Sequence, residues 1–351
     1  MLPNVRVAVL AGGLLLLGNT AAHEINPLHE KYTQNSNTPF GRAFDAVHEE
    51  ITQLARACQL AHPGPVQAPL VCTDRNTRDQ EARGNKYDSL VRGVWWNDDP
   101  NQLLFAVRQG KFWAWMRDAR RIATTNHNWK GKPAAIDGTY YMAYRSHYGD
   151  LQFLHAMASR NGEPARDTQQ SILLWAEFAY AVATGRVDLE TKMDRVPPSD
   201  LQPYFRNQGG WTVNYLFAPR YRLKSASHIR SMAAGSLLHM VQDSYSAAHA
   251  DRAFEASDRC PTGSVLEFHS YTHQRPDLHQ AVDRRTAWQA RTFTTAQDPV
   301  NVSATLLAYI AQRADWNVVR DYLQGTVFCI DEGAREAGPG GFVVATTGGR
   351  S

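Results

Sequence analysis

One short stretch in the second half of the chain constrains the fold more than any other. Residues 237–252 read LLHMVQDSYSAAHADR and place His239, Asp243 and His249 close together in a segment with helical apolar spacing. Positions four apart lie one turn apart on the same face of a helix, so the side chains of His239 and Asp243 can contact the same ion or group. His249 returns to a neighbouring part of that face or lies in a turn just past it. A carboxylate buried beside apolar residues needs a cation or a hydrogen-bonding partner, which makes this stretch a candidate metal site.

Helical spacing recurs along much of the chain. Apolar residues repeat at three and four positions, which predicts helices over 40–60, 102–120, 143–160, 168–184, 225–249 and 300–324. Clusters rich in Pro and Gly separate these segments, and strand-like alternation is scarce. With 351 residues, 43% of them hydrophobic, the chain can bury a substantial core. We expect one mostly α-helical domain over 23–332, followed by a Gly-rich tail (333–351) that forms a flexible end or a small strand.

The N-terminus is typical of a secretory signal peptide. Arg6 precedes an apolar run over residues 7–18, and Thr20 and Ala22 supply the small residues that precede a cleavage site. The run is too short to span a bilayer comfortably, which disfavours the alternative of a transmembrane anchor. We therefore expect residues 1–22 to be removed and the mature chain, without a transmembrane segment, to begin at His23. Such a protein is secreted or periplasmic.

The chain contains four cysteines, Cys58, Cys72, Cys260 and Cys329. An even number in an exported protein favours two disulfides, and the absence of CxxC pairs argues against a cysteine zinc site. Three connectivities are possible. Proximity in the sequence favours Cys58–Cys72 together with Cys260–Cys329.

Further histidines and carboxylates can join the first three residues. His48 lies in a predicted helix, Asp98 follows two tryptophans in GVWWNDDP, and His147 opens the segment HYGDLQFLH. Imidazole and carboxylate ligands without thiolate suit zinc or another borderline divalent ion. A cluster of several ions needs a bridging carboxylate, and Asp243 is central enough for that role.

Two downstream segments compete for the last ligand positions. LHQAVD carries His279 and Asp283 at helical spacing, and EFHSYTH carries His269 and His273. We prefer His279 and Asp283 because that pair retains a carboxylate. We expect ordinary core or surface positions for three other histidines, His155, His228 and His273.

In their order, these residues resemble the zinc-dependent phospholipase C family of secreted bacterial enzymes, which shares a fold with single-strand-specific zinc nucleases. The family carries H-x3-D-x5-H on one helix, preceded by a helical histidine, an aspartate in a W-x-D-like loop and an HFYD-like segment, and followed by H-x3-E/D. The resemblance covers roughly residues 40 to 285. It departs at the predicted first residue, His23, where the family has tryptophan, and at Ser246-Ala247, where it has Gln-Pro. The matching residues are His48, Asp98, His147, His239, Asp243, His249, His279 and Asp283.

The resemblance implies a single-domain helical fold with three zinc ions in a cleft between helices. It implies one ion held by Asp98, His147, His239 and Asp243. A second would be held by the N-terminal residue His23, by His48 and by the bridging Asp243. The third would be held by His249, His279 and Asp283. Asp98 is also a candidate catalytic base.

The function implied is that of a phospholipase C, which cleaves phosphatidylcholine at a membrane surface into diacylglycerol and a phosphorylated head group. The formal net charge of +3 is small for this length, so we expect no stable nucleic acid partner. Two alternatives stay open. One is a single-strand-specific nuclease with 3′-nucleotidase activity, and the other is a periplasmic metal-binding or solute-binding protein without turnover.

Overall fold

The computed structural model describes residues 45–73, 88–100, 142–218 and 225–343, together with positions 118, 121, 125, 127 and 131. Several predicted features lie outside the described residues. These are the signal peptide (1–22), His23, most of the helix predicted over 102–120 and the end of the tail (344–351).

The described residues are mostly helical, as the sequence predicts, and they contain one two-stranded antiparallel sheet. The α-helices are α3 (Val47–Ala61), α5 (Ser89–Val94), α7 (Met142–Tyr148), α8 (Ala165–Ala183), α9 (Val213–Phe217), α10 (Ala226–Asp243), α11 (Pro276–Asp283), α12 (Arg285–Ala290), α13 (Pro299–Gln312) and α14 (Trp316–Tyr322). The 3₁₀ segments are η2 (Gln152–His155), η3 (Met193–Arg195) and η4 (Ser199–Gln208), and η5 (Leu323–Val327) is a π-helix. Strands β1 (Ala250–Ala253) and β2 (Ser264–Phe268) form the sheet.

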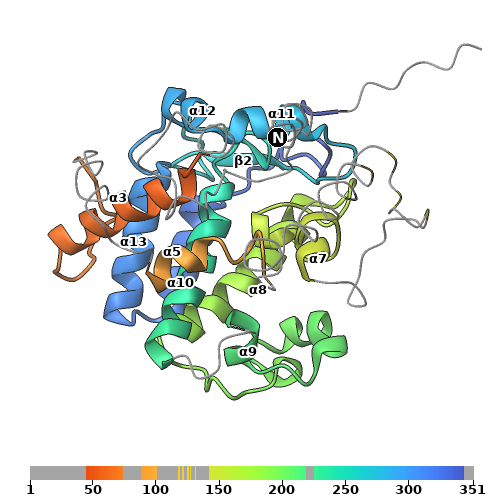
Figure 1. Cartoon of the computed structure of the whole chain (residues 1–351). Helices are drawn as coiled ribbons and strands as arrows, with labels where there is room; N and C mark the ends of the chain where they lie inside the picture. Colours follow the sequence, from red (N-terminus) through yellow and green to blue (C-terminus); the bar gives the residue numbers. More distant parts are fainter. Residues whose placement is uncertain are drawn as a thin grey trace, which may run out of the picture.

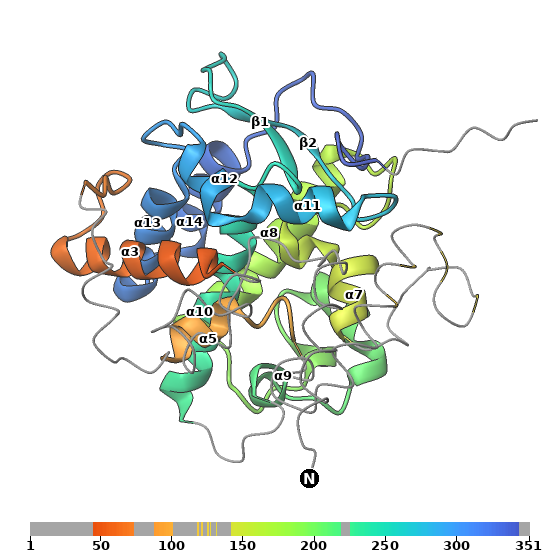
Figure 2. The ribbon, with the colours of Figure 1, turned by 45° about the horizontal axis from the view of Figure 1, so that its top comes forward.

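Helix α10 lies in the middle of the molecule, with α5, α8 and α13 packed around it (Figures 1 and 2). Where α5 and α10 cross, the two backbones touch at a pair of glycines. A Cβ on Gly235 would lie 2.2 Å from the carbonyl oxygen of Leu90 and 2.6 Å from the Cα of Gly93, so neither glycine has room for a side chain. This close approach holds the turn that follows α5, and Asp98 with it, beside the C-terminal half of α10.

Large aromatic side chains fill the core between the turn after α5 and α8. Trp96 stacks on Trp175 of α8 with ring centroids 5.4 Å apart, and Phe217 packs against both. A second apolar cluster joins α3 to α13 and includes the disulfide Cys58–Cys72. The other disulfide, Cys260–Cys329, ties the loop between β1 and β2 to the residues after η5. Both disulfides confirm the pairing favoured by sequence proximity.

Three of the predicted helices are interrupted, and the prediction of continuous helices there was wrong. The segment 143–160 is divided because the guanidinium of Arg145 donates to both carboxylate oxygens of Asp150, at 2.8 and 2.7 Å, and closes a turn after α7. The helix predicted over 225–249 ends at Asp243, because the guanidinium of Arg252 donates to the carbonyl of Ser244. The segment 300–324 breaks at Arg313, whose φ of 51° is left-handed.

The first part of the Gly-rich tail lies along the chain that follows β2. The N–H of Arg335 donates to the carbonyl of Leu266, and Gly338 forms a bridge with His269. Val343 forms a further bridge with Gln274. Within the ranges that the structure describes, none of the helices combines the length and the apolar character needed to cross a membrane.

Candidate metal centre

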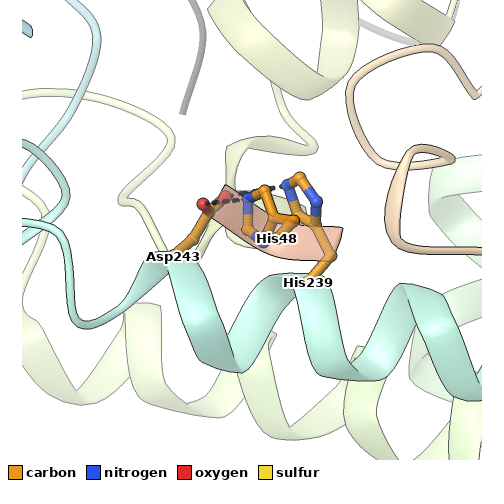
Figure 3. Close-up of side chains that lie close together, drawn as sticks. All are labelled: His48, His239 and Asp243. Atoms are coloured by element: carbon orange, nitrogen blue, oxygen red, sulfur yellow. Dashed lines mark ion pairs between the residues drawn. The ribbon is translucent and has the colours of Figure 1, made fainter. Parts of the chain in front are cut away.

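Nine buried side chains from separate elements converge beside the C-terminal end of α10, and we call them the central cluster. Helix α10 supplies two of them and the turn after it a third, and the others come from α3, the turn after α5, α7, η2 and α11. The members are His48, Asp98, His147, His155, His239, Asp243, His249, His279 and Asp283. Eight were predicted from the sequence. Figure 3 shows how His48 reaches across to His239 and Asp243, which lie one turn apart on α10.

Asp243 lies at the centre of the cluster. Its Oδ1 is 3.1 Å from Nε2 of His48, and its Oδ2 is 2.9 Å from Nε2 of His239. The same Oδ2 is 2.8 Å from Nδ1 of His155. His48, His239 and Asp243 therefore form one group whose ligand atoms lie within 4.8 Å of one another.

A second group shares His239 with the first. Asp98, His155 and His239 offer ligand atoms within 4.8 Å of one another, and Nε2 of His239 lies 3.0 Å from Nδ1 of His155. Nε2 of His147 lies 3.6 Å from Oδ1 of Asp98, beyond hydrogen-bonding distance. Both carboxylate oxygens of Asp98 are buried and accept no hydrogen bond in the described structure. Asp98 therefore presents two oxygens to the space between these histidines.

The third group is formed by His249, His279 and Asp283. Nε2 of His249 lies 3.2 Å from Nε2 of His279, which in turn lies 3.0 Å from Oδ2 of Asp283. The hydroxyl of Ser246 donates to the other oxygen of Asp283 and fixes the carboxylate. The short helix α11 places His279 and Asp283 one turn apart, as their spacing predicts.

The histidines share one orientation: each uses its outer nitrogen to donate to an oxygen and turns its inner nitrogen into the cluster. An accepting oxygen keeps the proton on the outer nitrogen, so in a neutral ring the inner nitrogen is left with a lone pair. This is the arrangement of histidines that ligate metals. In five of the histidines the outer nitrogen is Nδ1, which donates to Gln242 Oε1 from His48 (2.7 Å), to Ala143 O from His147 (2.9 Å), to Val94 O from His239, to His155 O from His249 (2.7 Å) and to Gln274 Oε1 from His279 (2.6 Å). In His155 the outer nitrogen is Nε2, which donates to Asn97 O (3.2 Å).

Burial and charge set the protonation states. Burial lowers the pKa of His249 and of His279 to about 3, so both rings are neutral near pH 7. Burial alone would raise the pKa of Asp243, but the surrounding histidines, His239 first, hold it well below its usual range. Burial likewise opposes charging of His48, yet Asp243 and then Asp98 raise its pKa to about 9. Asp243 therefore stays ionised and attracts a cation.

These states make the centre suited to a metal ion. The inner nitrogens of His249 and His279 are both lone-pair atoms, and they face each other and the carboxylate of Asp283. Such atoms repel unless a cation lies between them. Each of the three groups can hold a metal ion; the first two share His239, and Asp243 of the first contacts His155 of the second.

His155 is the member that the sequence prediction missed, since it was assigned to the ordinary core or surface. The signal available was its place as the second histidine of HYGDLQFLH, eight residues after His147. Tyr271 was missed as well. Its ring stacks on that of His279 with centroids 5.0 Å apart, and its buried hydroxyl has no hydrogen-bond partner in the described structure.

The remaining candidates lie apart from the central cluster. His273 is exposed, and His228 bonds to Ser89. His269 belongs to a different group, with Asp251 and Glu267. The backbone N–H of His269 donates to the carbonyl of His249 at 2.8 Å, but the side chains of His269 and His273 do not join His249 in a ligand group.

Comparison with protein-family models, with curated proteins and with solved structures gives no match for this chain.

Proposed function

We propose that this chain is an exported, zinc-dependent phosphodiester hydrolase, and specifically a phospholipase C. The observation that carries the proposal is the pair of neutral histidines, His249 and His279, whose lone-pair nitrogens face each other at 3.2 Å beside the carboxylate of Asp283. Two adjoining groups of the same chemistry share His239, and Asp243 of one group lies 2.8 Å from His155 of the other. A site for several neighbouring ions is the arrangement used by enzymes that transfer phosphoryl groups.

Zinc fits these ligands by type and by spacing. It prefers imidazole nitrogen and carboxylate oxygen at about 2.1 Å, which separates two ligand atoms at the tetrahedral angle by about 3.4 Å. The separations of 3.1 Å between His48 and Asp243, 3.2 Å between His249 and His279, and 3.6 Å between His147 and Asp98 are near that value. We assign one ion to each of the three groups. His147 is assigned to the group of Asp98.

Bound zinc supplies Lewis-acid activation of water and neutralises the charge of a phosphodiester. Asp98 is ionised, because the neighbouring histidines outweigh burial and lower its pKa. Its oxygens take the proton of the attacking water as the water oxygen bonds to phosphorus. The bond from phosphorus to the glycerol oxygen then breaks, and that oxygen takes up a proton. The products are diacylglycerol and a phosphorylated head group.

Tyr271 contributes a hydrogen bond to the same reaction. Burial, reinforced by the charges of Asp243 and Asp283, raises the pKa of its phenol well above the usual value, so the hydroxyl keeps its proton. The protonated phenol of Tyr271 can donate to a phosphoryl oxygen of the substrate. Its buried hydroxyl then has a hydrogen-bond partner.

One feature of the described residues and one of the amino-acid sequence support export. The two disulfides fit a non-cytoplasmic protein. The N-terminal residues 1–22 carry the pattern of a signal peptide, and we propose that this segment directs secretion or transfer to the periplasm.

The test is an assay of the purified mature protein on phosphatidylcholine, on single-stranded DNA and on a 3′-nucleotide, with and without chelator. We expect zinc-dependent release of diacylglycerol and phosphocholine. Release of phosphatidic acid or fatty acid contradicts the assignment. Activity on DNA or the nucleotide alone indicates the nuclease alternative, and zinc binding without turnover indicates a binding protein.

A pair of variants checks the role of Asp98 in this assay. Asp98→Asn should lower kcat by about 10²–10⁴-fold, the range typical of general acid–base groups. Asp321→Asn changes an exposed carboxylate and should leave kcat unaltered.

A further inference from the structure

A second cluster of metal-ligating side chains lies on the β-hairpin, outside the central cluster. Asp251 of β1 stands opposite Glu267 of β2 in the register of the sheet, and His269 directly follows β2. The three offer ligand atoms within 4.8 Å of one another. Arg335 from the C-terminal segment bonds to both carboxylates. We call Asp251, Glu267, His269 and Arg335 the hairpin cluster.

His269 has the orientation of a metal ligand. Its side chain is fully buried, and its Nδ1 lies 3.1 Å from the backbone carbonyl of Ala248. That carbonyl can only accept, so Nδ1 carries the proton and Nε2 keeps a lone pair. Nε2 is buried and has no hydrogen-bond partner in the described structure. It is aimed at Oδ1 of Asp251, 3.5 Å away.

The spacing and the remaining oxygens fit one ion. The separation of 3.5 Å between Nε2 of His269 and Oδ1 of Asp251 is close to the roughly 3.4 Å between two ligands of tetrahedral zinc. Arg335 occupies Oδ2 of Asp251 and Oε2 of Glu267, each at 2.7 Å. Oδ1 of Asp251 and Oε1 of Glu267 are therefore not used by Arg335. The side chain of Asp251 is 42% exposed, which gives an ion a path from solvent.

We propose that Asp251, Glu267 and His269 bind one divalent transition-metal ion, zinc by the chemistry of its ligands, at a site separate from the central cluster. The two carboxylates and one imidazole leave a fourth position to water. A calcium or magnesium site is disfavoured, because those ions take oxygen ligands rather than imidazole nitrogen.

The ion would fasten the C-terminal segment to the hairpin. Gly340, at φ +61°, lies over the ring of His269 so closely that a Cβ there would be 2.4 Å from it. Gly338 bridges to the backbone of His269, and Arg335 holds the carboxylates from the same segment. An ion that fixes His269 therefore also fixes the surface on which residues 335–340 lie.

The experiment counts zinc in the full-length mature protein. The protein is stripped with chelator and dialysed against zinc, and bound metal is measured by elemental analysis. Asp251→Asn should bind one zinc ion per chain fewer than the wild type. The matched control is Asp277→Asn, which changes an exposed carboxylate that is likewise paired with an arginine, Arg275, and should bind as many ions as the wild type.

A second variant, His269→Gln, should lose the same single ion, and circular dichroism reports whether it folds. Because Asp251 is partly exposed, Asp251→Asn keeps the test decisive if His269→Gln does not fold. Equal zinc counts in Asp251→Asn and the wild type overturn the proposal, because Nε2 of His269 then carries a proton and pairs with Asp251. Loss of more than one ion also overturns it, since the hairpin cluster would then not be separate.

Discussion

The central cluster and the hairpin cluster orient their histidines in the same way but neutralise their carboxylates differently. In both, an outer ring nitrogen donates to an oxygen and the inner nitrogen faces a carboxylate. Asp243 is fully buried, with nitrogens of three histidines within 3.1 Å of its oxygens. Asp251 is 42% exposed and is paired with Arg335.

This difference predicts how firmly each cluster holds an ion. A buried carboxylate surrounded by histidines needs either a bound cation or a protonated ring such as His48, whose pKa is raised to about 9. Separating the carboxylate from that positive charge is costly in a medium of low dielectric constant. At the hairpin, solvent and Arg335 already stabilise the carboxylates. We therefore expect the central ions to be held more tightly than the hairpin ion and to exchange more slowly.

The largest effect should come from Asp243→Asn. Asp243 is within 3.1 Å of ligand atoms in two groups, so this change weakens two neighbouring ion sites at once and removes a negative charge from the cluster. We expect loss of more than one zinc ion and a fall in activity of more than about 100-fold, beyond the 10–100-fold typical of residues that only orient ligands. Elemental analysis and the phosphatidylcholine assay measure both quantities.

Asp283→Asn is the matched variant, because Asp283 lies 3.0 Å from His279 of its own group, whereas Asp243 contacts ligand atoms of two groups. It should cost one ion where Asp243→Asn costs more. Equal losses in the two variants would show that Asp243 does not connect the groups, and the difference drawn between the two clusters would then lose its basis.

His279→Ala should have the next largest effect. It removes the inner nitrogen that faces His249 at 3.2 Å, so we expect loss of one ion and about 100-fold or more in activity, with native circular dichroism. His273→Ala changes an exposed side chain and should alter activity by less than about twofold. The opposite ranking would assign the third site to His269 and His273.

How much of the centre could be predicted from sequence depended on whether its residues share an element. His239 with Asp243, and His279 with Asp283, stand four apart on helices, and that spacing alone brings each pair together. His48 and Asp98 were found through their order in a family resemblance, since contacts between distant elements leave no periodic signal. His155 was missed because a turn closed by Arg145 and Asp150 reorients the chain between His147 and His155.

The hairpin was missed for a related reason. Strands β1 and β2 have four and five residues, too few for alternation to be recognised. Asp251 and Glu267 meet only through the register of that pair, which the sequence does not reveal. The helical class followed from periodicity, whereas the ends of the helices depended on side-chain contacts such as that between Arg252 and Ser244.

The smallest effect is expected from Gln274→Leu, which acts where the two clusters come closest. The amide nitrogen of Gln274 donates to the carbonyl of Ala248, the same carbonyl that accepts from His269, and its Oε1 accepts from Nδ1 of His279. Removing the amide leaves the outer nitrogen of His279 without its acceptor, whereas His269 keeps the carbonyl of Ala248. Zinc affinity should therefore fall by about 10–100-fold at the third central group alone, and excess zinc should restore activity. Titration of the chelated protein with zinc measures this, with Gln289→Leu, an exposed glutamine, as the control. If the hairpin ion is lost instead, or if both are lost together, the two clusters form one coupled site and not two.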